Sequence, residues 1–230
     1  MAVVYVNFLA NELPINGKTT GELSDQYENL FVPAGLTFAI WGLIYLLLLI
    51  FVVIQFLPEY ESKVISNYWF ILSCLFNMSW IVAWHYEKIA LSILIMIGLL
   101  ITLTVINLQL NQEKQQFLKV VFGVYLGWIL IATIANTTAG LVSIQWTGFG
   151  ISEVTWTIIL ICAGIVVASF NMIRLENPYL AIAVAWAFLG IAIKRTADQP
   201  SIVLTAKIAM VLVLLASAFT IYRMVKLKSA

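Results

Sequence analysis

Charged side chains are scarce in this sequence. Asp, Glu, Lys and Arg together make up 10% of the 230 residues, whereas 63% of the residues are hydrophobic. A soluble domain carries about 25% charged residues, so this composition predicts a chain that crosses a membrane several times. The 12 basic and 11 acidic residues leave almost no cationic surplus, and no nucleic-acid partner is expected.

Side chains that bind metals are equally scarce. The sequence has one histidine, His85, and two cysteines, Cys74 and Cys162. Both cysteines lie in apolar runs, which indicates reduced residues in the core or facing lipid rather than a disulfide or a zinc site. His85 lies between Trp84 and Tyr86 at a predicted helix end. It is interpreted as an interfacial residue, with a haem ligand as the alternative. We therefore expect no metal site.

Long apolar runs dominate what is present. A helix needs about 20 apolar residues to cross the hydrocarbon core. Seven runs meet this requirement, at residues 33–57, 64–84, 89–110, 117–142, 154–172, 178–194 and 202–222. An eighth run, at residues 2–10, has about half the length. It predicts an interfacial helix or the end of a helix that begins upstream, and the following Asn11-Glu12-Leu13-Pro14 favours the second interpretation. No cleavable signal peptide is evident.

The segment 11–32 is a polar, mostly acidic loop between the first two apolar runs. Thr19 and Glu22 have the spacing of a capping box, which predicts a short helix over residues 22–29. Seven basic residues lie on one side of the predicted membrane and five on the other. This bias predicts a cytoplasmic C-terminus and an external loop 11–32, with the chain in a bacterial cytoplasmic membrane.

Three predicted spans carry aromatic and polar side chains at helical spacing. The three stripes are Phe38, Trp41 and Tyr45; Asn77, Trp80 and Trp84; and Trp128, Ala132 and Asn136. Lipid offers a buried amide no partner, so hydrogen bonds between helices would explain Asn77 and Asn136. Aromatic walls, a small residue and a few polar groups also form a pocket for a flat apolar ligand.

These stripes resemble three motifs of the TspO/translocator protein family, the tryptophan-rich sensory proteins. The motifs are P-x4-F-x2-W-x3-Y from Pro33 to Tyr45, N-x2-W from Asn77 to Trp80, and Y-L-x-W-x3-A-x3-N from Tyr125 to Asn136. They occur in the family's order, and the resemblance covers residues 11–142. The first motif lacks the family's usual tryptophan and second proline. A partial repeat of the third motif, at residues 178–186, lacks its closing asparagine.

The resemblance implies an all-α polytopic membrane protein with a TspO-like five-helix bundle, whose first helix is short or truncated. Residues 1–143 would form this bundle, with loop 11–32 as a lid, and residues 144–230 would add three transmembrane helices. The ligand-binding residues implied by the resemblance are Phe38, Trp41, Tyr45, Asn77, Trp80, Trp128, Ala132 and Asn136. A homodimer in the lipid bilayer is a further expectation.

The resemblance also implies a function. It points to a sensor or transporter that binds a flat apolar ligand, either sterol-like or a porphyrin- or haem-type tetrapyrrole. A membrane enzyme that degrades tetrapyrroles is one alternative, although the spans contain no evident general base or nucleophile. A secondary transporter of another small molecule is the second alternative. Buried mid-membrane charges are typical of transporters. Lys207 is the only candidate for such a charge, and it lies about one turn inside its predicted span, where it can reach the interface.

Overall fold

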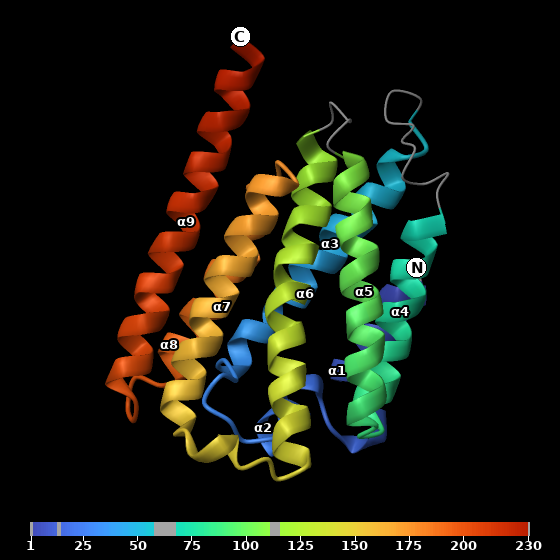
Figure 1. Cartoon of the computed structure of the whole chain (residues 1–230). Helices are drawn as coiled ribbons and strands as arrows, with labels where there is room; N and C mark the ends of the chain where they lie inside the picture. The colour runs from blue at the N-terminus through green and yellow to red at the C-terminus, as the bar shows by residue number, and fades with distance from the viewer. Residues whose placement is uncertain (1, 13–14, 58–67, 111–115, 230) are drawn as a thin grey trace.

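The computed structural model describes residues 2–12, 15–57, 68–110 and 116–229, and these form helices and connecting turns with no strand. The α-helices are α1 (Ala2–Glu12), α2 (Thr20–Gln26), α3 (Ile40–Ile54), α4 (Tyr68–His85), α5 (Ile89–Leu110), α6 (Gln116–Ser143), α7 (Glu153–Arg174), α8 (Leu180–Lys194) and α9 (Pro200–Ser229). Three short 3-10 turns are η1 (Ile15–Gly17), η2 (Gly35–Ala39) and η4 (Gly148–Gly150). The longer helices run side by side as a bundle (Figure 1). The predicted all-α polytopic fold is confirmed.

Each of the seven predicted spans contains a helix, but their lengths differ. Five helical segments of the described chain are long and apolar enough to cross a membrane: 35–54, 89–110, 116–143, 153–174 and 200–226. The helix α8 has 15 residues and α4 has 18, so each is shorter than the 20 residues expected of a full span. Part of the predicted span 64–84 lies outside the described residues. The first span begins with the turn η2 rather than with an α-helix.

The helix α6 lies at the centre of the bundle. Of its apolar stretch 72% is buried, against 22% to 39% for the other four segments long enough to cross. It packs against α3, α5, α7 and α8, and α9 covers α7 and α8 from outside. Because α6 is enclosed by helices, its side chains face protein on most sides and are available to line cavities.

The crossing of α6 and α8 is close because glycines line it. A Cβ at Gly127 would overlap the carbonyl oxygen of Leu180, and a Cβ at Gly123 would overlap the side chain of Asn177. Small residues allow helix backbones to approach in this way within a membrane. The α8 helix therefore packs directly on the part of the chain that carries the three motifs. The division into residues 1–143 and 144–230 stays a prediction.

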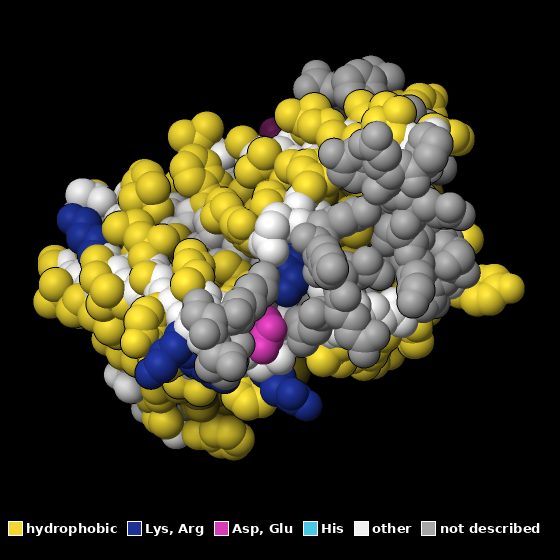
Figure 2. Space-filling model, turned by 90° about the horizontal axis from the view of Figure 1, so that it is seen from above, with side chains coloured by type: hydrophobic (Ala, Val, Ile, Leu, Met, Phe, Trp, Pro, Cys, Tyr) yellow, Lys and Arg dark blue, Asp and Glu magenta, His cyan; other side chains and the backbone are white. Residues whose placement is uncertain are grey.

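The two ends of the bundle carry different segments. One end holds α2, the turn between α4 and α5, and the loops on either side of η4 (Figure 1). The other end holds the C-terminus, and Lys and Arg side chains are scattered there among hydrophobic ones (Figure 2). We refer to the first of these as the lid end, because the predicted lid lies there.

Candidate functional site

Aromatic side chains from three helices meet near the lid end, with Trp41 among them. Its ring centroid lies 5.5 Å from that of Tyr45, 5.8 Å from Trp80, 6.0 Å from Trp128 and 6.2 Å from Tyr125. Aromatic pairs at such distances favour stacked or edge-on arrangements, and both occur here. The i, i+3, i+7 spacing predicted in the sequence therefore places these rings in one cluster.

This cluster surrounds a small cavity of about 40 Å³. The residues that line it are Thr20, Ser24, Pro33, Phe38, Trp41, Trp80, Trp84, Trp128, Ile131, Ala132, Ala135 and Asn136. Ligand pockets usually occupy about 300–1,000 Å³, whereas this space has room for little more than a water molecule. The rings fill most of the pocket themselves, so a flat ligand would need rings or lid to move.

Polar atoms around this cavity lack partners. Within the described part of the chain, the indole nitrogens Nε1 of Trp80 and Trp128 and the hydroxyl of Thr20 are buried without a hydrogen bond. The indole of Trp84, by contrast, donates to the carbonyl oxygen of Thr20 at 3.5 Å. A buried donor without an acceptor costs about 1–3 kcal/mol. Such a group needs an explanation, and a bound ligand or water is the usual one.

Six of the eight predicted binding residues line the cavity: Phe38, Trp41, Trp80, Trp128, Ala132 and Asn136. Tyr45 and Asn77 do not. Tyr45 stacks on Trp41 with an interplanar angle of 10° and so supports that ring from behind. A ligand-binding role for any of the eight stays a prediction.

The two asparagines of the motifs connect helices. Asn77 on α4 accepts a hydrogen bond from the Asn7 amide of α1 at 2.7 Å and donates to the Tyr125 hydroxyl of α6 at 2.8 Å. The Asn136 amide of α6 donates to the Ser92 hydroxyl of α5 at 3.1 Å. Interhelical hydrogen bonds therefore hold both amides, as the alternative interpretation of the sequence stated.

Sequence reasoning missed some of the lining residues. Trp84 was named in the second stripe but not among the eight expected binding residues, yet it is 4% exposed and lines the cavity. Its spacing of four residues from Trp80 carried the signal, because residues i and i+4 share a helix face. Ile131 and Ala135 share the α6 face of Trp128 by the same rule. Thr20 and Ser24, four residues apart on α2, and Pro33 line it as well; the sequence assigned them only to the lid and to the start of the first motif.

The lid, residues 11–32, contains the predicted capping box. The Thr19 amide donates to a carboxylate oxygen of Glu22 at 2.7 Å, and the Glu22 amide donates to the Thr19 hydroxyl at 3.3 Å. The Thr19 hydroxyl also donates to this carboxylate, at 2.9 Å, and the two hydrogen bonds that Thr19 donates to it, the backbone one contributing most, lower the pKa of Glu22. The predicted helix is confirmed, although it covers Thr20–Gln26 rather than residues 22–29.

One side of the lid is attached to the turn between α4 and α5. The Asn16 amide donates to the His85 carbonyl at 3.1 Å, Lys18 forms an ion pair with Glu87 at 3.4 Å, and the Tyr27 hydroxyl donates to Glu87 at 3.2 Å. Burial, and then the negative charge of Glu87, raise the pKa of Tyr27. Glu87 has φ of 55°, a left-handed conformation uncommon for this residue type.

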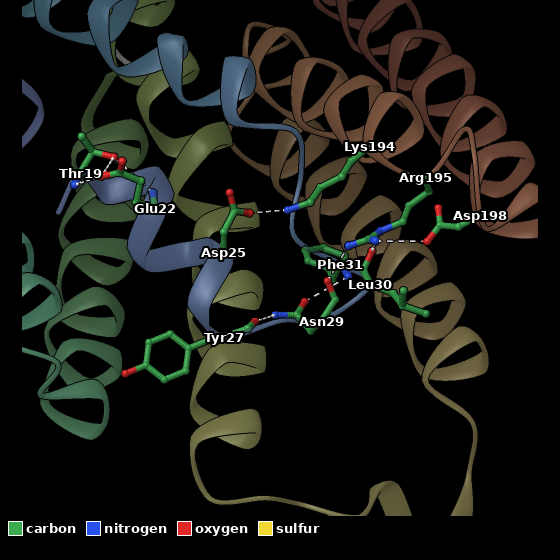
Figure 3. A network of polar contacts seen from close by, with 10 residues as sticks. All are labelled: Thr19, Glu22, Asp25, Tyr27, Asn29, Leu30, Phe31, Lys194, Arg195 and Asp198. Carbon is green, nitrogen blue, oxygen red and sulfur yellow. Dashed lines mark hydrogen bonds and ion pairs between the residues drawn. The ribbon is translucent and has the colours of Figure 1, made fainter.

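The other side of the lid is attached to the end of α8 (Figure 3). Lys194 forms an ion pair with Asp25. The Arg195 guanidinium donates to the carbonyl oxygens of Asn29 at 2.8 Å and Leu30 at 3.2 Å. Hydrogen bonds from a charged donor are stronger than neutral ones. Lys194, the last residue of α8, and Arg195, its C-cap, therefore hold the C-terminal half of the lid.

The segment after the lid is also held by α8. The amide of Ala34 donates to the Gly190 carbonyl at 3.1 Å, and the Trp186 indole donates to the Thr37 carbonyl at 2.8 Å. Trp186 belongs to the partial repeat of the third motif. It fixes the turn that leads into Phe38 and Trp41, and it does not line the aromatic cavity.

The fold and this site together define an all-α polytopic membrane protein in which aromatic side chains of three helices surround a small cavity, with Thr20, Ser24 and Pro33 in its wall. The sequence model of the family described as TSPO-like protein matches residues 1–219. The chain therefore belongs to the TSPO-like protein family, and the match continues through α7 and α8 into α9. No curated protein and no solved structure matches the chain.

Proposed function

We propose that this protein binds a flat apolar ligand, tetrapyrrole- or sterol-like, in the aromatic pocket beneath the lid, and acts as a sensor or transporter for it. The observation that carries the proposal is the pair of buried indole N–H groups of Trp80 and Trp128, which have no acceptor among the described residues. Both residues line the same cavity. A ligand with an acceptor oxygen on an apolar body would satisfy these donors while stacking on the rings.

The closed cavity supports a binding step that begins with the lid. Thr20, Ser24 and Pro33 belong to the lid or follow it directly, and they form part of the cavity wall. Moving them away opens the pocket toward the lid end. Ion pairs and hydrogen bonds hold the lid on two sides, so opening costs free energy that ligand contacts would have to offset.

The test is a titration of the detergent-purified protein with protoporphyrin IX, followed by the quenching of tryptophan fluorescence. Trp80→Phe and Trp128→Phe keep an aromatic ring and remove the N–H donor. Each is expected to weaken binding about tenfold, which corresponds to about 1.4 kcal/mol, the size of one hydrogen bond. Trp69→Phe is the matched control, because Trp69 lies near the start of α4, outside the cavity lining.

Two results would contradict the proposal. Binding by both phenylalanine variants at the parental affinity would show that water satisfies the indoles and that no ligand acceptor reaches them. Absence of saturable quenching of the unsubstituted protein would show that it does not bind this tetrapyrrole. Illumination of the complex adds a readout for the enzymatic alternative, because light-dependent loss of porphyrin absorbance indicates chemistry rather than binding alone.

We also propose that the C-terminus is cytoplasmic and the lid external. By the sequence pattern, seven of the twelve basic residues lie on the side away from the lid, and the described ones among them are Lys119, Arg174, Arg223, Lys226 and Lys228. Basic residues flanking spans favour the cytoplasmic side. A reporter domain fused after residue 230, active only in the cytoplasm, tests this orientation, and an inactive fusion with normal expression would reverse it. The homodimer stays a prediction.

A further inference from the structure

A second and larger cavity lies on the other side of α6, between α6, α7 and the lid. Its volume is about 460 Å³, within the range of about 300–1,000 Å³ that is usual for small-molecule sites. The lid contributes residues 28–31, α6 contributes residues from Thr133 to Val142, and α7 contributes residues from Glu153 to Leu160. None of the eight predicted binding residues lines it.

Most of the threonine hydroxyl groups in this cavity already donate a hydrogen bond within the protein. Four of its five threonines donate to a carbonyl oxygen of their own helix: Thr133, Thr137, Thr138 and Thr157, at 2.6 to 2.8 Å. Their oxygens then offer only lone pairs to a ligand. The indole of Trp156 likewise donates within the protein, to the Gly148 carbonyl at 2.9 Å. These hydrogen bonds therefore leave the cavity lining rich in oxygen atoms that accept hydrogen bonds.

Two carboxylates complete the lining. Glu28 of the lid and Glu153 at the first turn of α7 both border the cavity, and neither forms an ion pair within the described part of the chain. No lysine or arginine is among the residues that line it. Glu153 also stabilises the N-terminus of α7, but Glu28 has no such helical role, because α2 ends at Gln26.

Aromatic faces supply the apolar part of the site. Trp146 and Trp156 have ring centroids 5.2 Å apart and both line the cavity together with Phe31. An indole face attracts a cation by about 0.5–2 kcal/mol, depending on desolvation. Leucine, isoleucine and valine side chains make up most of the remaining wall, together with Asn29, Thr147 and Gly148. Acceptors, carboxylates and indole faces all favour the same ligand charge.

We propose that this cavity is a second ligand site, and that it binds a lipophilic organic cation, with the apolar body against α6 and α7 and the positive group toward Glu28 and Glu153. The cation could belong to a free amphiphilic amine or to the ammonium headgroup of a lipid, and both have the chemistry that the cavity complements. An uncharged ligand without a hydrogen-bond donor gains nothing from the carboxylates, and an anionic one is repelled by them.

The test compares two ions of the same shape and opposite charge. Equilibrium dialysis measures the binding of tetraphenylphosphonium and of tetraphenylborate to the full chain in dodecyl maltoside, each corrected for partition into protein-free micelles. The phosphonium is expected to bind at least tenfold more tightly than the borate. Equal affinities would overturn the proposal and leave a cavity that takes apolar groups without regard to charge, and so would absence of phosphonium binding.

Neutral variants locate the charge effect. Glu28→Gln and Glu153→Gln are each expected to weaken phosphonium binding about threefold, and the double variant about tenfold, since both carboxylates are partly hydrated. Glu176→Gln removes one charge at the opposite end of α7 and serves as the control. Unchanged phosphonium affinity in the double variant would overturn the assignment. Protoporphyrin binding by the double variant reports separately on the aromatic pocket.

A competition experiment identifies the source of the cation. Phosphatidylethanolamine and diacylglycerol carry the same chains, but only the first has an ammonium group. Displacement of the phosphonium by phosphatidylethanolamine and not by diacylglycerol supports a lipid headgroup as the occupant. Displacement by neither supports a free amine. Equal displacement by both overturns the proposal, because the lipid chains would then be the recognised part.

Discussion

The two cavities lie on different faces of α6 and differ in both size and chemistry. The aromatic cavity of about 40 Å³ is lined on α6 by Trp128, Ile131, Ala132, Ala135 and Asn136. The cavity of about 460 Å³ is lined on α6 by Thr133, Ile134, Thr137, Thr138, Leu141 and Val142. With about 100° between successive residues, the centres of the two sets lie about 140° apart around the helix, and the sets meet at Ile131, Thr138 and Val142.

The comparison indicates that the hydrogen-bonding capacity left free around a cavity predicts the class of its ligand better than the cavity volume does. Around the small cavity, indole donors lack acceptors. Around the large one, four threonine hydroxyls already donate their hydrogen bond to backbone carbonyls. Inside a membrane, lipid cannot complete either set. The small cavity therefore favours a ligand that accepts hydrogen bonds, and the large one favours a ligand that donates them or carries positive charge.

The largest expected effect comes from moving α6 itself, the wall that both cavities share. In Gly127→Ala the added methyl would overlap the Leu180 carbonyl of α8, which is backbone and cannot rotate away. We expect a loss of stability at the upper end of about 1–3 kcal/mol, together with weaker binding at both sites. Thermal unfolding in detergent measures it.

The control for this variant is Gly140→Ala on the same helix. There the new methyl would meet the end of the Ile93 side chain, which can rotate, and alanine also favours the helix over glycine by up to about 1 kcal/mol. Equal melting temperatures for the two variants would show that the α6–α8 crossing is not what fixes the common wall.

The sequence predicted much of the aromatic side of this comparison and none of the other side. Phe38, Trp41, Trp80 and Trp128 were found because large rings at helical spacing stand out among aliphatic residues. The capping box of Thr19 was found because it is local in sequence. Both signals depend only on residues within one turn or two of each other.

The larger cavity gave no such signal. Its walls come from segments far apart in the chain, and its threonines satisfy themselves within their own helices, so no spacing rule selects them. The attachment of the lid by Arg195 could not be predicted from the sequence either. Arg195 donates to the backbone carbonyls of Asn29 and Leu30, and every residue has a backbone carbonyl, so the residue types do not indicate the contact. For Asn77, the sequence predicted a hydrogen bond between helices but not the partner, Asn7 of α1, which lies 70 residues away in the sequence.

The second prediction concerns the attachment of the lid. Arg195→Ala removes charged donors from the carbonyls of Asn29 and Leu30, and each such bond contributes about 1.5–3 kcal/mol. Residues 28–31 also form a wall of the larger cavity. We therefore expect phosphonium binding to weaken several-fold, and more than porphyrin binding does.

Limited proteolysis gives an independent readout of the same variant. Cleavage within the lid should become faster in Arg195→Ala, while Lys207→Ala, which removes an exposed positive charge from α9, should leave it unchanged. Equal losses of phosphonium and porphyrin affinity would mean that the lid moves as one unit. They would contradict the expectation that its C-terminal half acts mainly on the larger cavity.

The third prediction separates space from packing on α6. Ala132 borders the aromatic cavity, whereas Ala139 is 2% exposed and borders neither cavity. Ala132→Val should cost less than about 1 kcal/mol, because added methyls enter free space, while Ala139→Val should cost about 1–3 kcal/mol by overpacking. Porphyrin affinity should fall only in the first variant. A reversed order of melting temperatures would place Ala132 at a packed contact.

The smallest expected effect is a pH dependence confined to the N-terminal half of the lid. Hydrogen bonds from Thr19 lower the pKa of Glu22 in the folded protein, so the folded state binds this proton less tightly than the unfolded state does. The capping contribution is thus complete above the ordinary glutamate pKa, and it is lost as the pH falls from there through the lowered pKa. The protection of the α2 amides, taken as the intrinsic exchange rate at each pH divided by the observed rate, should fall over that range, while the protection of Phe31, beside the larger cavity, should not follow it. In Glu22→Gln, which removes the titrating group and leaves all others, α2 should exchange faster at neutral pH and lose this acid response. An acid response of α2 that persists unchanged in Glu22→Gln would assign it to other carboxylates and remove the distinction between the two halves of the lid.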